Sequence, residues 1–312
     1  MNRRLLILIL ILFLSLLVGC SSIQKDISNL FINIEKSRSD LTYQTVSVEG
    51  KDAAYLERKG TGESIVFLHG FSADKNNWIR FVRYLPKKYH VLAIDMPGHG
   101  DNIQNDVQKY DPTSLSLGVG KIIDAIGLDR FHIAGNSLGG LVSKIYAFRH
   151  PDKIITIGLF DSAGVISSEP GEFFKGLEKG YNPFDVKTRE DYDVLKAYAF
   201  HNQPFIPWPV DAVMARERIK RNDFNQKIFN DVIQQKALLN PDFQNEMVSH
   251  LTMPVIVIWG DKDRILHVSS VEVYRQYIQN LEVVILKDCG HMPMIERPEE
   301  TAKYYTNFIS KY

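Results

Sequence analysis

From about residue 43 onward, short apolar runs alternate with amphipathic segments, and this alternation restricts the possible folds more than any other feature of the sequence. Short apolar runs that end at turn residues are typical of buried strands, and apolar residues at helical spacing indicate helices packed on them. Strands that alternate with helices form parallel crossover units. The sequence therefore predicts an α/β fold, with strands over 64–69, 91–94, 131–135, 154–160, 254–259 and 282–286.

The alternation is interrupted in two places. Residues 43–58 contain two alternating segments without a helix between them, which predicts an antiparallel hairpin at the sheet edge. Residues 166–248 contain helical and irregular stretches without a convincing strand. We therefore expect a core of residues 43–165 and 249–312, with a helical cap of residues 166–248 inserted after the strand that ends near Phe160. The cap is expected over the carboxyl edge of the sheet, where open α/β sheets bind ligands.

The N-terminus has the pattern of a secretory signal. Arg3 and Arg4 precede an apolar run from Leu5 to Val18, which is short for a membrane span of about 20 residues. The run ends in Leu-Val-Gly-Cys20, which resembles a bacterial lipoprotein signal that is cleaved before the cysteine. We expect residues 1–19 to be the signal peptide, Cys20 to be acylated and residues 20–42 to form a polar tether. An uncleaved signal anchor is the alternative.

Acylation at Cys20 predicts a protein held at a membrane surface of the bacterial cell envelope without spanning the bilayer. Ser21 after the cysteine is compatible with the outer membrane of a Gram-negative cell. Removal of the signal leaves Cys289 and Cys20 as the two cysteines. With Cys20 acylated, no intramolecular disulfide can form.

Composition and motif spacing exclude several function classes. The chain has 37 basic and 37 acidic side chains, a balance that argues against nucleic-acid binding. No His, Cys or Asp cluster has the spacing of a metal site, and no G-x-G-x-x-G follows a strand. We therefore expect no metal, no dinucleotide and no other cofactor, and nothing in the sequence indicates an obligate protein partner.

The strongest chemical motif is the pentapeptide Gly135-Asn-Ser137-Leu-Gly139, a G-x-S-x-G pattern between a buried strand and a helix. A sharp strand-to-helix turn forces the serine backbone into an unfavourable region, and glycines two residues to either side remove the clashes of a Cβ. The turn exposes the hydroxyl at the positive end of the following helix. Ser137 is therefore the expected nucleophile.

A serine hydroxyl needs a base, and the base needs an orienting acid. Among the histidines after Ser137, only His291 lies in a loop directly after the last expected strand; we expect packing or surface roles for His150, His201, His250 and His267. Asp263, in the loop after the strand that ends at Trp259, is the expected acid. Asp261 is expected to organise that turn. Asp161, at the end of the strand after the nucleophile helix, is the rival.

Acyl transfer also needs two backbone N–H groups aimed at the oxyanion. We expect one from Leu138, directly after the nucleophile, and the other from Phe71, in the loop after His69-Gly70. His69 is expected to brace that loop, and His99 to stabilise the turn after the strand that ends at residue 94.

Five segments carry a family resemblance: 69–78 (HGFSADKNNW), 95–100 (DMPGHG), 135–140 (GNSLGG), 259–263 (WGDKD) and 289–291 (CGH). Together they resemble the α/β-hydrolase family, and within it the monoacylglycerol lipases and bacterial lipases with a G-N-S-x-G-G turn. The resemblance covers residues 43–312 and implies hydrolysis of carboxylic, lipid-type esters by a Ser137–His291–Asp263 triad. Leu138 departs from the methionine that is common in these lipases. The serine excludes the dehalogenases and epoxide hydrolases of the fold, which use a carboxylate there.

Other functions remain open at this point. The same triad serves carbon–carbon bond hydrolases and amidases, and a non-catalytic ligand-binding receptor is a third possibility. The apolar pairs and runs of the cap, Phe173-Phe174 and 205–208 (FIPW), fit an acyl pocket, a membrane contact or the core of the cap equally well.

Overall fold

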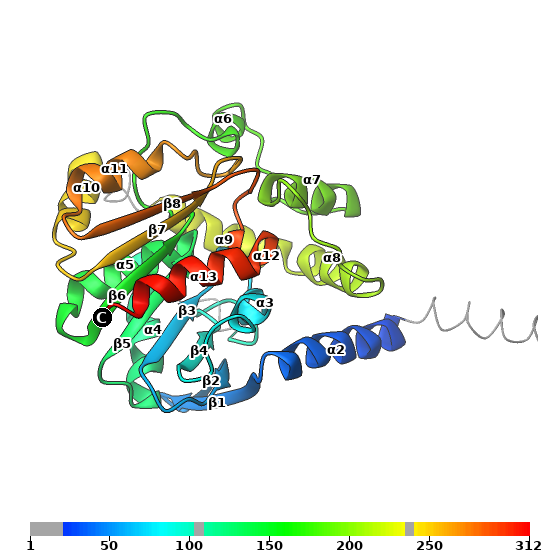
Figure 1. The fold of residues 1–312 in the computed structure, drawn as a ribbon. Coiled ribbons are helices and arrows are strands. Elements are labelled where there is room, and N and C mark those ends of the chain that lie inside the picture. Colours follow the sequence, from blue (N-terminus) through cyan, green and yellow to red (C-terminus); the bar gives the residue numbers. More distant parts are fainter. Residues whose placement is uncertain (1–20, 103–108, 235–239) are drawn as a thin grey trace, which may run out of the picture.

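The computed structural model describes residues 21–102, 109–234 and 240–312 of the chain. The expected signal peptide, residues 1–19, and the expected lipidation site, Cys20, lie outside the described residues. The described part forms one eight-stranded sheet in the order β1-β2-β4-β3-β5-β6-β7-β8 (Figure 1). The strands are β1 Thr42–Val48, β2 Lys51–Arg58, β3 Ser64–Leu68, β4 His90–Ile94, β5 Phe131–Asn136, β6 Ile154–Phe160, β7 Val255–Gly260 and β8 Leu281–Leu286.

The sheet is mostly parallel, as the alternation of strands and helices predicts. All pairings from β4 through β3, β5, β6 and β7 to β8 are parallel. The β1–β2 hairpin is antiparallel, lies at the edge next to β4, and confirms the hairpin expected over 43–58. Because neighbouring parallel strands run in the same direction, the loops after β3, β5, β6, β7 and β8 all open at one edge of the sheet.

Helices cover both faces of the sheet (Figure 1). Residues from α4 (Pro112–Ile126), α5 (Leu138–Arg149) and α11 (Ser270–Tyr277) form one buried cluster with residues of the strands. Residues from α3 (Ile79–Val82), α12 (Pro293–Glu296) and α13 (Pro298–Ile309) form a second cluster with other strand residues. The described residues also include two short 3-10 helices, η1 at Lys75–Trp78 and η2 at Pro151–Lys153.

The helical spacing of Trp78, Phe81, Val82 and Leu85 predicts a helix over 76–85, but the helix that forms is shorter. It consists of η1 and the single turn α3, and residues 83–85 continue as turns closed by bonds between residues three apart, from Tyr84 N to Phe81 O and from Leu85 N to Val82 O. The side chain of Asp74 accepts from Asn76 N and so starts a 3-10 turn instead of an α-helix. The apolar spacing marked the buried face correctly, since Trp78, Phe81 and Val82 are fully buried.

The described part of the long insertion between β6 and β7 contains helices joined by irregular segments: α6 Glu172–Glu178, α7 Arg189–Ala199, α8 Val210–Lys220, α9 Asn222–Ile233 and α10 Pro241–Ser249. The last of these helices ends next to the expected cap boundary at residue 248. Helix α10 packs against α5 and α11, and its Met247 and Val248 belong to the main buried cluster. Ile228 of α9 belongs to the same cluster, so both helices pack on the core, and the bounds of the cap, 166–248, stay a prediction.

Residues 21–38, expected to be part of a polar tether, form one continuous helix, α2 (Ser21–Arg38), that docks on the body. Its C-terminal part is bound to the core through an ion pair of 2.7 Å between Glu35 and Arg83. Toward its N-terminus it packs beside α8, where Lys25 lies 3.6 Å from Glu217 (Figure 1). Within the described ranges, no helix has the length and apolar character needed to cross a bilayer.

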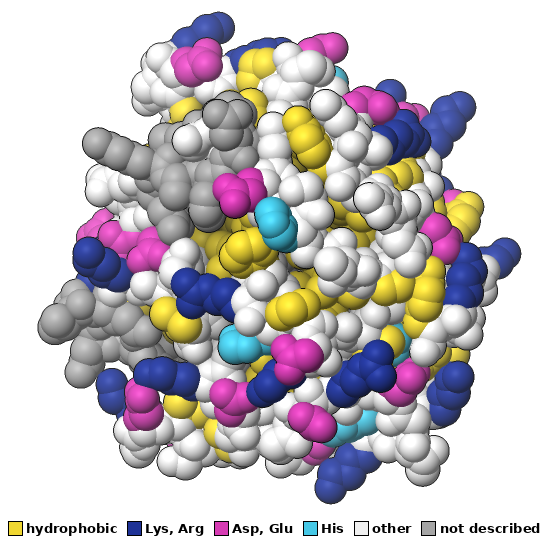
Figure 2. All heavy atoms as spheres, turned by 90° about the vertical axis from the view of Figure 1, so that its left-hand side faces the viewer, with side chains coloured by type: hydrophobic (Ala, Val, Ile, Leu, Met, Phe, Trp, Pro, Cys, Tyr) yellow, Lys and Arg dark blue, Asp and Glu magenta, His cyan; other side chains and the backbone are white. Residues whose placement is uncertain are grey.

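One face of the molecule can be compared with the balanced charge of the chain. On the face shown in Figure 2, basic and acidic side chains lie intermixed among apolar and neutral ones. Mixed charge of this kind does not form the basic stripe that nucleic-acid binding requires.

Candidate active site

Every residue expected to take part in chemistry lies at the carboxyl edge of the parallel strands. Phe71 follows β3, and Ser137 lies between β5 and α5. Asp161 directly follows β6, Asp263 lies in the loop after β7, and His291 lies in the loop after β8. The sheet order places these five strands side by side, which brings together residues more than 200 positions apart in the chain.

Ser137 has the strained backbone that the sequence pattern predicts. Its φ of 54° and ψ of −119° are unfavourable for a residue with a Cβ, and such strain costs about 1–3 kcal/mol. Two backbone hydrogen bonds hold it there: Ser137 N donates to Phe160 O, and Ala163 N donates to Ser137 O, both at 3.0 Å. The loop after β6 thus fixes both backbone groups of the serine.

The glycine two residues after the serine lets the turn pack directly on the sheet. A Cβ on Gly139 would lie 2.3 Å from Leu68 O and 2.4 Å from His69 O. The start of α5 therefore rests on the end of β3, next to the loop that carries Phe71.

His291 and Asp263 form a buried hydrogen-bonded pair. The distance from His291 Nδ1 to Asp263 Oδ2 is 2.7 Å, and the two residues are 4% and 5% exposed. Because the partner at Nδ1 is a carboxylate, that nitrogen carries a proton, and Nε2 is the nitrogen that can accept one. Asp263 Oδ1 accepts from the N–H groups of Ile265 and Leu266 at 2.8 and 2.9 Å, which fixes the carboxylate.

The loop of His291 is tied to the nucleophile turn and to the cap. Asn136 Nδ2, next to the serine, donates to His291 O at 3.0 Å. His291 N donates to Ala199 O at the end of α7, also at 3.0 Å, and Glu296 accepts from Gly290 N at 2.6 Å. These three bonds fix the backbone of the loop that carries His291, and the first of them ties it to the residue next to Ser137.

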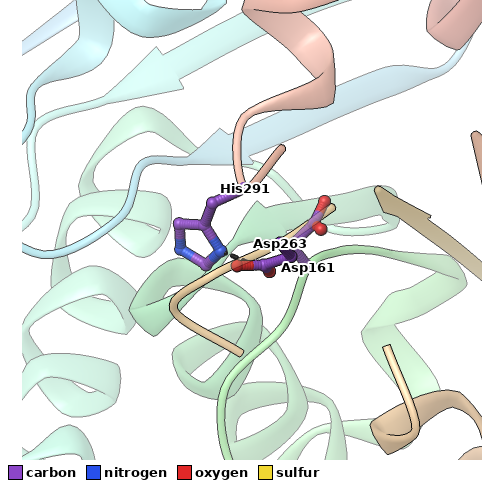
Figure 3. A group of neighbouring side chains, drawn as sticks. All are labelled: Asp161, Asp263 and His291. Atoms are coloured by element: carbon purple, nitrogen blue, oxygen red, sulfur yellow. Dashed lines mark hydrogen bonds and ion pairs between the residues drawn. The ribbon is translucent and has the colours of Figure 1, made fainter. Parts of the chain in front are cut away.

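Asp161 lies beside this pair but does not replace Asp263 (Figure 3). Its side chain is fully buried, and its Oδ1 accepts from Gly260 N at 2.9 Å. Burial, and next to it the charge of Asp263, raise the pKa of Asp161 well above its usual value. The hydrogen bond to His291 is made by Asp263.

These three residues are also close enough to share a metal ion, since one ligand atom of each lies within 4.8 Å of the others. Asp263 and His291 already bind each other, and backbone N–H groups occupy the second oxygen of Asp263. The arrangement is that of a proton-transfer pair, not of a set of open ligands.

The loop after β3 is braced by His69, as expected. His69 Nε2 accepts from Met96 N at 3.1 Å, so its Nδ1 carries the proton and donates to Gly70 O at 2.8 Å. Burial lowers the pKa of His69, which keeps the ring neutral. Leu138, the other expected oxyanion donor, begins α5 and is 3% exposed.

The cap covers this loop with aromatic rings. The ring of Phe71 contacts Phe184 at 5.2 Å and Phe229 at 5.8 Å between centroids, and Phe173 contacts Phe184 at 5.2 Å. Phe205 is 81% exposed, in the segment between α7 and α8. Among the aromatic residues of the cap, Phe173 is therefore part of an interior cluster, whereas Phe205 is on the surface.

Sequence reasoning missed the contacts that helix α8 makes with the core. Arg218 of the cap donates to Ser72 Oγ in the loop of Phe71, and burial lowers the pKa of Arg218 to about 10. One turn further, Arg221 donates to Gly98 O and Gly100 O at 2.7 and 3.1 Å. The residues joined lie more than 100 positions apart, so no local pattern indicates these contacts.

Comparison with known proteins gives consistent matches along the whole chain. The sequence model of the "Alpha/beta hydrolase family" matches residues 65–304. "Lipase 1" of Psychrobacter immobilis is 29% identical over 306 residues, with 96% of this chain and 95% of that protein covered. A "Monoacylglycerol lipase" of Xenopus laevis is 32% identical over 263 residues, with 81% of this chain and 77% of that protein covered. The crystal structure described as "a membrane phospholipase A, a novel bacterial virulence factor" has a TM-score of 0.89 and 36% identity, and covers 100% of this chain and 99% of its own.

Proposed function

Since this chain belongs to the alpha/beta hydrolase family, we propose that it hydrolyses lipid esters through Ser137, His291 and Asp263. It is a serine hydrolase of the lipase type, to which its relatives named lipase and monoacylglycerol lipase point. The observation that carries the choice of residues is the buried His291–Asp263 pair, 2.7 Å apart, at the same sheet edge as the strained serine. A strained serine beside an oriented imidazole is the arrangement that nucleophilic acyl transfer needs.

In the proposed mechanism, Ser137 attacks the ester carbonyl while His291 Nε2 takes the proton of its hydroxyl. Asp263 keeps the proton on Nδ1 and stabilises the imidazolium that forms. His291 then gives the proton to the departing alcohol, which leaves an acyl-serine. Water, activated by the same imidazole, releases the fatty acid and restores the serine.

The amides of Phe71 and Leu138 are proposed to bind the oxyanion of each tetrahedral intermediate. Leu138 opens α5, so its N–H is one of the free donors at a helix N-terminus, where a negative charge is favoured. The loss of one such donor costs about 2.7–4 kcal/mol of barrier in serine hydrolases. The brace of His69 and the close contact at Gly139 support the proposal, because both hold the two donor segments together.

We propose monoacylglycerols and related acylglycerols as the substrate class. Aromatic rings of the cap lie over the loop of Phe71, and an interior apolar cluster of this kind favours an acyl chain over a polar group. A substrate panel of monoacylglycerols, phospholipids, simple amides and carbon–carbon cleavage substrates separates this proposal from the other reactions of the same triad.

We also propose that Cys20 is acylated and holds the enzyme at a membrane surface of the cell envelope. Helix α2 starts at Ser21, directly after this cysteine, and docks on the body through Glu35 and Lys25. An anchor on Cys20 would therefore be connected to the body by a packed helix of about 27 Å, at 1.5 Å per residue. Palmitate labelling that disappears in Cys20→Ala supports the anchor; labelling that persists contradicts it.

The test of the catalytic proposal is hydrolysis of p-nitrophenyl acyl esters by the mature protein and by Ser137→Ala. The variant removes one oxygen at a surface-facing turn, so it should keep the thermal unfolding curve of the wild type and lose turnover. Equal turnover by a folded Ser137→Ala would refute the assignment.

A further inference from the structure

Asp161 is a buried carboxyl group that the proposed mechanism does not use. Figure 3 shows its carboxyl group next to that of Asp263, on one side of the His291 ring. An oxygen of each carboxyl and a nitrogen of His291 lie within 4.8 Å of one another. Asp161 is fully buried and Asp263 is 5% exposed, so bulk water screens neither group.

Two ionised carboxylates at this distance are not compatible with burial. Among the described residues, Asp263 pairs with His291, and no lysine or arginine lies within ion-pair distance of either carboxyl group. Like charges in a shared, desolvated site raise the pKa of one member of the pair, as in other carboxyl dyads. One of the two groups therefore holds a proton.

The hydrogen bonds decide which group holds the proton. Asp263 accepts from three N–H groups: those of Ile265, Leu266 and the His291 ring. Three donors stabilise a carboxylate strongly. Asp161 accepts from Gly260 N at Oδ1, whereas its Oδ2 is buried and receives no hydrogen bond from the described residues. A proton on Oδ2 turns this unsatisfied acceptor into a donor, and the neighbouring carboxylate of Asp263 can accept from it.

We propose that Asp161 holds a proton and donates it in a hydrogen bond to Asp263, as a positioning residue for the carboxylate that orients His291. Both oxygens of the carboxyl group then form hydrogen bonds, since Oδ1 accepts from Gly260 N and Oδ2–H donates to Asp263. Its backbone is fixed as well, because Asp161 N donates to Ile258 O at 3.0 Å. Asp161 thereby connects the ends of β6 and β7 under the imidazole.

This inference rests on the proposed role of Asp263. A hydrogen-bond donor at the carboxylate lowers its basicity, so Asp161 also tunes how strongly Asp263 stabilises the imidazolium of His291. Two further titratable groups interact with Asp161. The charge of Glu296 raises the pKa of Asp161, and Asp161 in turn adds to the effect of burial, which raises the pKa of the Cys289 thiol. Both are neutral or acidic, so neither offers the positive charge that would ionise Asp161.

The experiment compares Asp161→Asn, Asp161→Ala and Asp263→Asn for kcat, KM and the acid limb of the pH profile with a soluble ester. The amide in Asp161→Asn keeps one acceptor for Gly260 N and one donor for Asp263, so kcat should stay within about threefold of the wild type. Asp161→Ala removes the hydrogen bond that positions Asp263 and, through it, the His291 ring, so kcat should fall about 10- to 100-fold at unchanged KM. The acid limb should also move to higher pH in Asp161→Ala, because Asp263 then stabilises the imidazolium more.

Asp263→Asn should lose about 10⁴-fold in kcat. If Asp161→Asn lost as much, the inference would be overturned, because Asp161 would then act as an ionised acid. Asp161→Ala with wild-type kcat and an unchanged acid limb would overturn it as well. An active Asp263→Asn would instead refute the proposed function, so the two failures are distinguishable.

A second measurement does not depend on activity or on whether Asp161→Ala folds. The infrared difference spectrum between the wild type and Asp161→Asn should contain the carbonyl band of a protonated carboxylic acid in the wild type. If the difference spectrum contains carboxylate bands instead, Asp161 is ionised and the inference is wrong.

Discussion

Gly139→Ala tests how closely the nucleophile turn must approach the sheet. The added methyl group would lie 2.3 Å from Leu68 O and 2.4 Å from His69 O, whereas ordinary contacts of a Cβ begin at 3.4 Å. The obstacle is backbone of the central strand β3, which no rotamer change can move aside. The start of α5 must therefore shift by about 1 Å away from β3, a displacement that separates the Leu138 amide from the loop of Phe71 and the serine from His291.

A displacement of about 1 Å at a reacting group can cost about 100-fold in rate. We expect kcat/KM of Gly139→Ala for a p-nitrophenyl ester to fall by about that factor, and its free energy of unfolding to fall by about 1–3 kcal/mol because the site is overpacked. The control is Gly50→Ala in the β1–β2 turn, where φ is +78° and nothing lies within 4 Å of the added Cβ. It should lose about 1–2 kcal/mol of stability from backbone strain alone and keep wild-type turnover.

Urea unfolding and steady-state kinetics on the same preparations give both quantities. Gly139→Ala with wild-type kcat/KM would refute the reasoning that contact with β3 sets the position of the nucleophile. An equal loss of turnover in Gly50→Ala would show that destabilisation alone, and not displacement at the site, explains the effect.

Three further predictions concern the cap, the surface and a buried lysine. Arg218→Ala, which loses the bond to the loop of Phe71, should lower kcat about tenfold or more, whereas Arg221→Ala, which loses bonds to the neighbouring loop, should change kcat less; equal effects on kcat would contradict a role for Arg218 in holding the oxyanion loop. Phe205 and Trp208 are 81% and 52% exposed, so Phe205→Ser/Trp208→Ser should weaken sedimentation with lipid vesicles and leave hydrolysis of a soluble ester unchanged; unchanged sedimentation would exclude these side chains from the membrane contact. Burial lowers the pKa of Lys144 well below its usual value in the folded protein, whereas in the unfolded chain the lysine keeps its proton up to about pH 10.4. Between these two pKa values the unfolded state binds one proton more, so the free energy of unfolding should rise with pH by at most about 1.4 kcal/mol per unit. Lys144→Met should lack this contribution, and an identical pH slope in urea unfolding of both proteins would show that Lys144 is charged in the native state.

The parts of the fold that the sequence predicts well are those in which local pattern and tertiary environment agree. Apart from His132, the run from Phe131 to Gly135 is apolar because β5 is buried on both faces, and the strained turn at Ser137 needs glycine for reasons visible in the pentapeptide itself. His291 could be chosen among five histidines because loops after parallel strands share one edge of the sheet.

What the sequence does not predict depends on contacts between distant segments. The polar composition of residues 21–38 indicates a tether, but partners on α3 and α8 hold it as the docked helix α2. Helix α10 packs on α5 and α11, a contact that no local pattern indicates. Asp161 and Asp263 are 102 positions apart, and only the pairing of β6 with β7 makes them neighbours.

The central claim is that Ser137 is the nucleophile and is activated by His291. The most direct measurement is reaction of the mature protein with a fluorophosphonate, followed by mass spectrometry of its peptides. We predict a single adduct on Ser137 that is absent in Ser137→Ala and strongly slowed in His291→Ala. An adduct on another residue, or ester hydrolysis without any adduct on Ser137, would contradict the account.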